Sequence, residues 1–437
     1  MILLLLLDLG QALKAVEAIM DITGTPGVGI GNRVAANDDT RYNINSLSKA
    51  VFSSLVGIEA HREALDWFKP IKIRLPDFSS AGKQIEDNCT VVDLLSHRTG
   101  LSSLDDFWMG ADNVVYLHKS QVLPTFRTLP VSEPFRQSLE YNNWGYEIVA
   151  QILERTTNQS VSNLLYDQLF APLGMSRTST AWESGDDNEA KSYGILEDLS
   201  TEEIARPALG NGTTMEAAGG VKSTLRDMLT FYKSFMQETN FQFSSGSDSS
   251  ESSPFKNCRM LTTNHARLPG VSWREQGYAL GWGRSQLPGR LGLLSGNAMY
   301  GGSPIVGKEN SSLILWHHGC MPGSTSIVYL APDIESGVVV LQNSMPMVDT
   351  ADLIGQLVLE TILRVREPND YVEIARKFYG KGVNHLRHLR RYLDDRRTLG
   401  TKARPLSAYT GTYWNQPKTF FITVYEKAGR LFMATQA

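Results

Sequence analysis

The chain has 437 residues, of which 42% are hydrophobic and 20% are charged, with a formal net charge of −4. This composition leaves ample material for a hydrophobic core in one large domain or two ordinary ones. Three scattered cysteines without a Cys-x-x-Cys pair indicate neither a disulfide framework nor a structural zinc site. The most basic stretch, residues 380–397, interleaves bases with acids and apolar residues. We expect a solvated helix face there rather than nucleic-acid binding.

The first 24 residues open with an apolar run that ends at Asp8. A membrane span needs about 20 apolar residues, and no basic segment precedes this run. From Leu9 onward, the helical spacing of apolar residues predicts an amphipathic helix, formed by Leu9, Leu13, Val16, Ile19 and Met20. We therefore expect a packed first helix, no stable membrane insertion and a cytoplasmic protein. A secretory or membrane-associated segment is the alternative.

The middle of the chain predicts helices. Residues 46–60 and 144–170 have helical apolar periodicity, and the second region is interrupted near Asn158. Residues 223–237 predict a third helix with Ser223 as its N-cap. The segment 238–254 is polar and serine-rich, so we expect a flexible surface loop.

From about residue 277 the pattern changes to short β-rich segments, at 277–284, 311–319, 324–332 and 336–344. Residues 349–366 predict a helix that covers this sheet, and residues 370–399 a charged helix. Two final strands are expected at 406–414 and 420–426. Helices followed by a run of antiparallel strands favour an α+β fold over alternating βαβ units.

One Ser-x-x-Lys pair enters a long apolar helix, where positions i and i+3 share a face. This pair is Ser46 and Lys49. If the helix is buried, desolvation lowers the pKa of the Lys49 amine, which can then take the serine proton. The alternative is an ordinary exposed pair at a helix start. Two other Ser-x-x-Lys pairs lie in loop-like segments, Ser80 with Lys83 and Ser253 with Lys256.

Two further motifs follow in chain order, Tyr141-Asn142-Asn143 at a helix entry and His317-His318-Gly319 at a strand end. Together with Ser46-x-x-Lys49, these motifs resemble the signature of the serine β-lactamase-like superfamily, which includes class C β-lactamases, D-alanyl-D-alanine peptidases and family VIII esterases and transacylases. The similarity extends over roughly residues 20–365.

The resemblance implies a β-lactamase/transpeptidase-like catalytic domain over residues 1–366, an antiparallel sheet flanked by helices. A mostly helical subdomain at about 60–270 carries the serine-rich loop 238–254. Residues 367–437 would form a helical linker and an incomplete β extension, because two predicted strands cannot close a small barrel.

The resemblance also implies the roles of the site residues. Ser46 would be the nucleophile, Lys49 and Tyr141 would share the role of general base, and Asn143 would orient the lysine amine or the substrate. The third motif, with His317 and Gly319, would line the site, and the backbone N–H groups of Ser46 and Cys320 would form the oxyanion hole. No cofactor is implied.

Structural rather than catalytic roles are the alternative for several of these residues. Cys320 is expected to be a small strand residue rather than a nucleophile, and His97 a structural hydrogen-bonding residue. His317 and His318 are unsuited to binding one metal ion, because adjacent strand residues point to opposite faces.

The chain departs from the family pattern in two places. Roughly 15 to 20 residues, a hairpin in the family, are absent between residues 25–30 and Ser46. The third motif carries a histidine where a lysine would supply a permanent charge for a substrate carboxylate.

The histidine favours neutral esters, amides or thioesters over β-lactam antibiotics. We therefore expect a serine hydrolase that works through an acyl-Ser46 intermediate on a small-molecule acyl substrate. The alternatives are a transacylase of natural-product metabolism and a catalytically inactive binding protein of the same fold.

Overall fold

The computed structural model describes residues 2–25, 36–110, 113–183, 185–186, 188–270, 272–301, 303–402 and 404–435. The helices are α1 Ile2–Thr23, α2 Ser48–His61, α3 Lys83–Asn88, α4 Val91–Leu95, α5 Val122–Phe126, α6 Trp144–Thr157, α7 Val161–Leu165, α8 Ala171–Leu173, α9 Glu216–Gly219, α10 Leu225–Ser245, α11 Cys258–Thr262, α12 Thr350–Ile362 and α13 Tyr371–Asp395. The strands are β1 Tyr42–Asn43, β2 Ser192–Ile195, β3 Thr201–Ile204, β4 Lys222–Ser223, β5 Ala266–Arg267, β6 Gln276–Tyr278, β7 Gly283–Gln286, β8 Gly289–Arg290, β9 Ile305–Val306, β10 Leu313–Met321, β11 Ser324–Ala331, β12 Ser336–Gln342, β13 Ser344–Met345, β14 Gly411–Trp414, β15 Phe421–Lys427 and β16 Arg430–Thr435.

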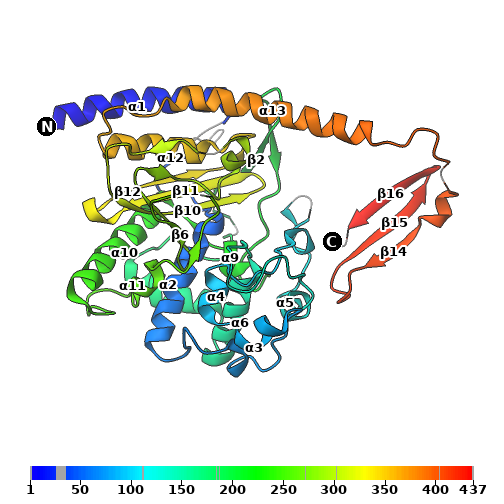
Figure 1. Ribbon diagram of the computed structural model, residues 1–437, viewed down its shortest axis with the longest axis horizontal. Helices are drawn as coiled ribbons and strands as arrows, with labels where there is room; N and C mark the ends of the chain where they lie inside the picture. The colour runs from blue at the N-terminus through cyan, green and yellow to red at the C-terminus, as the bar shows by residue number, and fades with distance from the viewer. Residues whose placement is uncertain are drawn as a thin grey trace.

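A central antiparallel sheet separates two helical layers (Figure 1). Among the described residues it has six strands in the order β12-β11-β10-β7-β6-β5. Side chains alternate between its two faces. On β11, Ile327 and Tyr329 face the core under α12 and α13, whereas Val328 and Leu330 face the core that contains α2, α6 and α10. The antiparallel α+β arrangement predicted from the sequence is confirmed.

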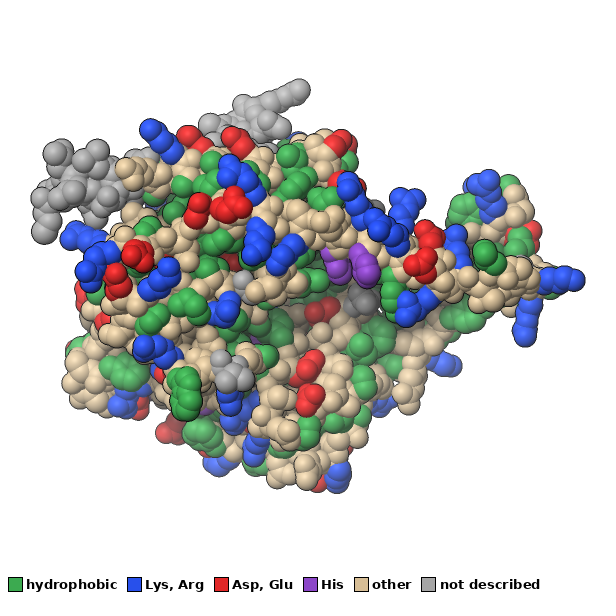
Figure 2. Space-filling view, turned by 45° about the horizontal axis from the view of Figure 1, so that its top comes forward, with side chains coloured by type: hydrophobic (Ala, Val, Ile, Leu, Met, Phe, Trp, Pro, Cys, Tyr) green, Lys and Arg blue, Asp and Glu red, His purple; other side chains and the backbone are tan. Residues whose placement is uncertain are grey.

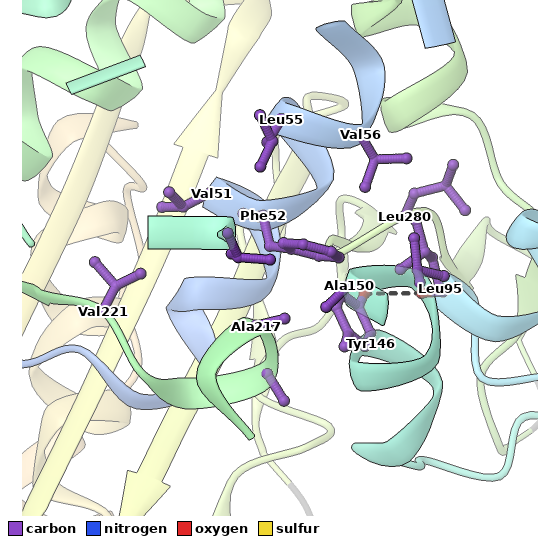
Figure 3. Packing of buried hydrophobic residues seen from close by; sticks show 14 of the residues in the cluster. Val51, Phe52, Leu55, Val56, Leu95, Tyr146, Ala150, Ala217, Val221 and Leu280 are labelled. Carbon is purple, nitrogen blue, oxygen red and sulfur yellow. Dashed lines mark hydrogen bonds between the residues drawn. The ribbon is translucent and has the colours of Figure 1, made fainter. Parts of the chain in front are cut away.

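The helix α2 runs through the larger core and is buried on all sides from Ser48 to Glu59. In Figure 3, Phe52 and Val56 face Tyr146 of α6 and Leu280 of the β6–β7 turn. The Tyr146 hydroxyl donates to the carbonyl of Leu95 over 2.8 Å. The buried side chains of α2 include polar ones, among them Lys49, Ser53 and Glu59. This burial therefore determines the environment of any polar side chain on α2.

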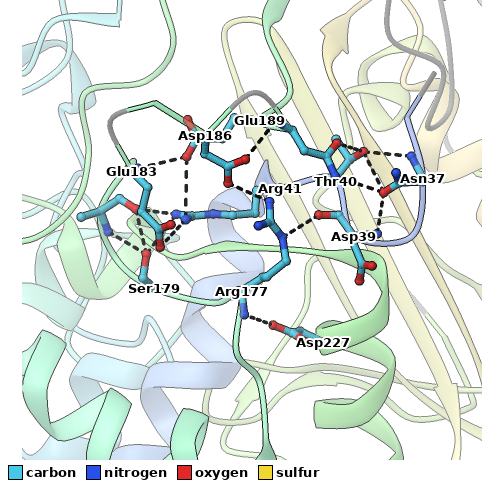
Figure 4. Close-up of polar contacts among 12 residues, drawn as sticks. Asn37, Asp39, Thr40, Arg41, Arg177, Ser179, Glu183, Asp186, Glu189 and Asp227 are labelled. Carbon is cyan, nitrogen blue, oxygen red and sulfur yellow. Dashed lines mark hydrogen bonds and ion pairs between the residues drawn. The ribbon is translucent and has the colours of Figure 1, made fainter. Parts of the chain in front are cut away.

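A polar network fixes the chain segment that leads into α2 (Figure 4). The guanidinium of Arg41 is fully buried, lies 2.7 Å from the Glu183 carboxylate, and donates over 3.0 Å to Ser179 and over 2.6 Å to the carbonyl of Ala181. A buried charge is tolerated only when it is paired and hydrogen-bonded in this way. The network attaches β1 to the loop after α8.

The N-terminal helix α1 packs beside α13 and on α12 (Figure 1). Ile19 is fully buried and Val16 and Met20 are half-buried, as the periodicity predicts. Leu13, predicted on the same face, is instead 63% exposed. In the described part of the chain, no helix combines the length and apolarity that a membrane crossing requires.

Three predicted boundaries are wrong. The helix α10 continues to Ser245, eight residues into the predicted loop, because Gln242 accepts a hydrogen bond from the backbone N–H of Cys258 and donates to Glu238. Its N-cap is Thr224 rather than Ser223, which lies in β4. The segment 277–284 is not one strand but β6 and β7, separated by a turn at Gly281 with φ +83°.

The C-terminal segment forms a sheet apart from the body, at the end of α13 (Figures 1 and 2). Its described residues form three strands in the order β14-β15-β16, where the sequence predicted two. The turn before β15 contacts α5 and the loop that precedes it. Thr419 and Thr125 share a 3.0 Å hydrogen bond, and the Phe420 ring lies 5.4 Å from Tyr116 and 6.2 Å from Phe107.

The expected absence of a hairpin before Ser46 falls largely on residues 26–35, which lie outside the described residues. Within the described ranges, β12 is an edge strand of the central sheet. The predicted boundaries of the catalytic domain, 1–366, and of the extension, 367–437, stay predictions.

Candidate active site

Ser46 lies in a single 3₁₀ turn, η1 (Asn45–Leu47), directly before α2. The preceding Asn45 has φ +52°, a conformation that asparagine tolerates better than most residues. Its side chain accepts from the Ser324 hydroxyl and donates to the Ser324 carbonyl, both over 3.2 Å. The carbonyl of Ile44 accepts a 2.8 Å hydrogen bond from Ser326. Strand β11 therefore holds the turn that carries the serine, and Ser46 itself is half-buried.

Lys49 lies one turn further along and has three polar partners. Its Nζ is 3.0 Å from Ser46 Oγ, 2.7 Å from Asn143 Oδ1 and 2.9 Å from the carbonyl of Ala218. The side chain is fully buried. Burial lowers the pKa of Lys49 to about 7, although the carboxylates of Asp105 and Glu147 act in the opposite direction.

The other two Ser-x-x-Lys pairs do not bring their side chains together. Lys83 Nζ instead contacts Glu86 at 3.2 Å and Asp87 at 2.9 Å. Lys256 Nζ contacts the backbone carbonyls of Ser250 and Ser253. A buried helix start therefore distinguishes Ser46 from these pairs.

Tyr141 is half-buried beside the same pair. Its ring centre lies 5.0 Å from Lys49 Nζ. Burial raises the pKa of Tyr141 well above its ordinary value, while the neighbouring Ser46 side chain acts in the other direction. The side chain is therefore a neutral phenol near pH 7.

A chain of hydrogen bonds links the second motif to the third. His317 Nδ1 is 2.7 Å from the carbonyl of His318 and so carries a proton, which leaves His317 Nε2 to accept from the Tyr278 hydroxyl over 2.8 Å. The Tyr278 oxygen is 3.3 Å from His97 Nε2, and His97 Nδ1 accepts the backbone N–H of Asn142 over 3.0 Å. Burial lowers the pKa of both His317 and His97 well below the usual value, so both rings are neutral.

Gly319 and Cys320 follow on β10, next to the turn that carries Ser46. A Cβ on Gly319 would lie 2.8 Å from the carbonyl of Ile44 and 2.4 Å from Ser326 Oγ, so only glycine fits without displacement. Strand β10 pairs with β7 only from Leu313 to Trp316, so the strand beyond Trp316 faces η1 on that side. Cys320 is exposed.

Comparisons with known proteins bear on the family and the fold of this chain. Residues 23–361 match the beta-lactamase family. The chain belongs to that family. The unguisins hydrolase ungD of Aspergillus violaceofuscus is 24% identical over 431 residues, which cover 90% of this chain and 70% of that protein.

A second curated relative of this beta-lactamase family chain is the unguisins hydrolase ungD' of Aspergillus campestris. It is 24% identical over 331 residues, which cover 74% of this chain and 56% of that protein. The chain thus spans little more than half the length of this relative. Among solved structures, the octameric penicillin-binding protein homologue from Pyrococcus abyssi aligns with a TM-score of 0.67 and 18% identity, over 98% of this chain and 90% of that one. The family and fold predicted from the motifs are confirmed.

The second histidine of the third motif points away from the site. His318 pairs with Asp349 at the start of α12, and both side chains are buried. Burial opposes the charge on His318, but the Asp349 carboxylate outweighs it and raises the pKa of His318. The two histidines therefore do not converge, and the described residues contain no group of three or more His, Cys, Asp or Glu side chains suited to a metal ion.

Several groups that surround Ser46 and Lys49 in the structure were not predicted from the sequence. Asp105 lies outside every helix and strand predicted from the sequence, and no motif includes it. Glu147, one turn into α6, is buried beside α9, and the carbonyl of Ala218 faces the lysine. Tyr278 lies in the predicted β-rich segment 277–284, where the pattern indicates a strand but no role for the hydroxyl.

Proposed function

We propose that the protein is a serine hydrolase that cleaves an ester or amide through an acyl-Ser46 intermediate. The observation that carries this proposal is the position of the Lys49 amine, 3.0 Å from Ser46 Oγ inside a buried helix start. Hydrogen-bond reach between nucleophile and base is the geometric requirement for this chemistry. The names of the two fungal relatives, both hydrolases, support the same reaction type.

In the proposed acylation, Ser46 Oγ attacks the carbonyl carbon while its proton passes to Lys49 Nζ. The tetrahedral intermediate then collapses, the bond to the leaving group breaks, and the leaving group takes the proton through the Tyr141 hydroxyl. A pKa of about 7 suits Lys49 as the base at neutral pH, whereas the raised pKa of Tyr141 suits a relay that stays protonated. Water then hydrolyses the acyl-enzyme by the reverse sequence.

The developing oxyanion would be held by the backbone N–H groups of Ser46 and Cys320. The close contact of Gly319 with Ile44 and Asn45 supports this role, because it brings the end of β10 against the turn before the serine. Each fixed donor of this kind supplies about 3 kcal/mol to the transition state.

The acyl substrate would be neutral on the side that faces the third motif. A substrate carboxylate needs a cation or free N–H donors there, and the neutral His317 offers neither. One ring nitrogen is taken by the His318 carbonyl and the other by Tyr278. This supports neutral esters, amides or thioesters over β-lactam antibiotics.

Intact mass spectrometry after incubation with a p-nitrophenyl ester tests the proposal. We expect an acyl adduct on the wild-type protein and on Ser80→Ala, which removes a serine with the same Lys spacing but no lysine contact. The adduct should be absent from Ser46→Ala. A wild-type protein that binds the ester without an adduct would instead be an inactive binding protein of this fold.

The same adduct also separates hydrolysis from acyl transfer. We expect it to decay to free acid at a rate that is unchanged by added alcohols or amines. Decay that is accelerated by an acceptor, with the acyl-acceptor product formed, would identify a transacylase.

A further inference from the structure

A short acidic turn lies beside the candidate site and contacts Asn143 of the second motif. This turn is η3 (Asp105–Phe107), between α4 and α5. Asn143 Nδ2 donates to both carboxylate oxygens of Asp105, over 3.1 and 3.2 Å. The indole N–H of Trp108 donates to Asp105 Oδ1 over 2.8 Å, which fixes the carboxylate in turn.

The carboxylate leaves the Asn143 side chain one favourable orientation. The amide NH₂ group must face the acceptor oxygens of Asp105, so Oδ1 must face Lys49 Nζ, at 2.7 Å. Rotating the amide by 180° would place its oxygen against the carboxylate. It would also place its N–H against the amine. Without Asp105, only the second of these contacts would select between the two orientations.

The orientation of this amide decides where the lone pair of a neutral Lys49 points. A neutral amine has two N–H donors and one lone pair. Asn143 Oδ1 and the carbonyl of Ala218 can only accept, so they take the two N–H groups. The third neighbour is Ser46 Oγ, at 3.0 Å, and its hydroxyl is then the donor to the lone pair. A rotated amide would donate to the lone pair and compete with the serine.

We infer that Asp105 is a positioning residue: it holds the Asn143 amide in the orientation that leaves the Lys49 lone pair for the serine hydroxyl. This inference rests on the proposed function, because it assigns the base of that reaction. Asp105 acts through Asn143 and has no contact with Ser46 among the described hydrogen bonds.

Asp105 has a second, separable effect through its charge. Its carboxylate favours the protonated form of Lys49 and so opposes the lowering of the lysine pKa by burial. The other groups that face this amine are Glu147, Tyr141 and Tyr146 on or before α6, His97 after α4 and His317 on β10. Loss of the Asp105 charge alone should therefore lower the pKa of Lys49.

Two substitutions in the full chain separate orientation from charge. Asp105→Asn keeps an oxygen that can accept from Asn143 but removes the charge. Asp105→Leu removes both. The control is Asp77→Asn, which removes an exposed carboxylate paired with Arg155 at 2.6 Å, outside the site. The measurement is the rate of the p-nitrophenol burst, followed from pH 5 to pH 9, with thermal melting to verify folding.

We expect Asp105→Leu to slow acylation about 10- to 100-fold on the high-pH plateau, as the loss of a residue that orients a functional group typically does. Asp105→Asn should stay within about 3-fold of wild type there. The pH at which the burst rate is half of its plateau value should fall in both variants and stay unchanged in Asp77→Asn. In an Asn143→Ala background, Asp105→Leu should add no further loss on the plateau, because there is no amide left to orient.

The outcomes are decisive. A plateau rate for Asp105→Leu within 2-fold of wild type overturns the inference, and so does a loss that multiplies with that of Asn143→Ala. If Asp105→Leu does not fold, Asp105→Ala, which also removes both acceptor oxygens, decides by the same comparison of plateau rates, alone and in the Asn143→Ala background. A wild-type protein without a Ser46 adduct overturns the proposed function and this inference together, whereas an intact adduct with an unaffected Asp105→Leu overturns the inference alone.

Discussion

Burial acts in opposite directions on the two candidate proton carriers of the site. It lowers the pKa of Lys49 to about 7 and raises the pKa of Tyr141 well above its ordinary value, because in each case the neutral form is the one favoured away from water. At neutral pH the amine can therefore accept a proton while the phenol keeps its own. The same low polarity makes the arrangement sensitive to every nearby charge.

The pH dependence of acylation follows from the pKa of Lys49. The neutral amine is the active form, so the burst rate should rise with pH through a midpoint near 7 and reach a plateau above pH 8, where about 90% of the amine is neutral. Burst rates measured from pH 5 to pH 9 check this expectation. Lys49→Arg, which stays protonated throughout, should abolish the burst. A rate that does not change between pH 5 and pH 9 contradicts the assignment of Lys49 as the base.

Glu147 should make the folded protein less stable as the pH rises. Burial raises the pKa of Glu147 from 4.5 to about 7, and one of its oxygens accepts from the backbone N–H of Ala217. The folded state then holds the proton more tightly than the unfolded state, so its stability falls between pH 4.5 and about 7, by about 3 kcal/mol.

Glu147→Gln tests this effect, since glutamine keeps the acceptor oxygen and cannot ionise. We expect the variant to be more stable than wild type at pH 8 by about 3 kcal/mol, with little difference at pH 4.5, in denaturant unfolding monitored by circular dichroism. An equal difference at both pH values would show that packing rather than ionisation separates the two proteins.

Among the individual site residues, those that belong to a sequence motif could be predicted. Ser46, Lys49, Tyr141 and Asn143 were found because their motifs are ordered along the chain, and the structure brings them together. Asp105 belongs to no periodic element, and its contact with Asn143 joins segments 38 residues apart. Only the folded chain reveals such a partner.

At the scale of elements, the site depends on how closely β10 approaches η1. Gly319 makes this approach possible, because a Cβ there would lie 2.4 Å from Ser326 Oγ and 2.9 Å from the Cβ of Asn45. The backbone carbonyl of Ile44, at 2.8 Å from that position, cannot rotate away as a side chain can. Any side chain at this position must move the strand or the turn.

We expect Gly319→Ala to slow acylation at least 10-fold, because it separates the proposed oxyanion donor on β10, the N–H of Cys320, from the serine, at a cost of about 3 kcal/mol for a lost donor. The control is Gly296→Ala, where a Cβ meets nothing within 4 Å. Burst rates of both variants and their melting temperatures check this. Normal acylation in a folded Gly319→Ala protein would exclude the proposed hole.

The elements themselves were predictable where one periodicity dominates. The strands β11 and β12 lie within the predicted β-rich segments, and β10 overlaps its segment but continues two residues further, to Met321. Each strand is rich in apolar residues, with β-branched or aromatic ones among them. The end of α10 was not predictable, since a serine-rich segment favours a loop and only the contacts of Gln242 with Cys258 extend the helix. Strand β16 was missed because Arg430–Thr435 lacks strict alternation.

At the scale of the whole molecule, two cores support the site from opposite sides of the sheet. The larger core contains α2, which carries Lys49, and α6, which begins directly after Asn143. The smaller core contains α12 and the first half of α13. The first half of α13 buries apolar side chains against the body, namely Tyr371, Ala375 and Phe378. In its second half, the apolar side chains of Leu386, Leu389 and Leu393 are exposed. The helix therefore leaves the body part-way along its length (Figure 1).

Residues 405–435 should consequently be dispensable for the folding of the body. Neither core cluster contains any residue beyond Tyr379, and the described contacts of the C-terminal sheet with the body gather around Thr125, Phe107 and Tyr116. A chain that ends at residue 404 should melt within about 2 °C of the full chain, since a loss of 1 kcal/mol in a body of this size shifts the midpoint by about that much. It should also still form the Ser46 adduct. A fall of more than about 5 °C would mean that the C-terminal sheet stabilises the loop that carries Asp105, and the body would then not be an independent folding unit.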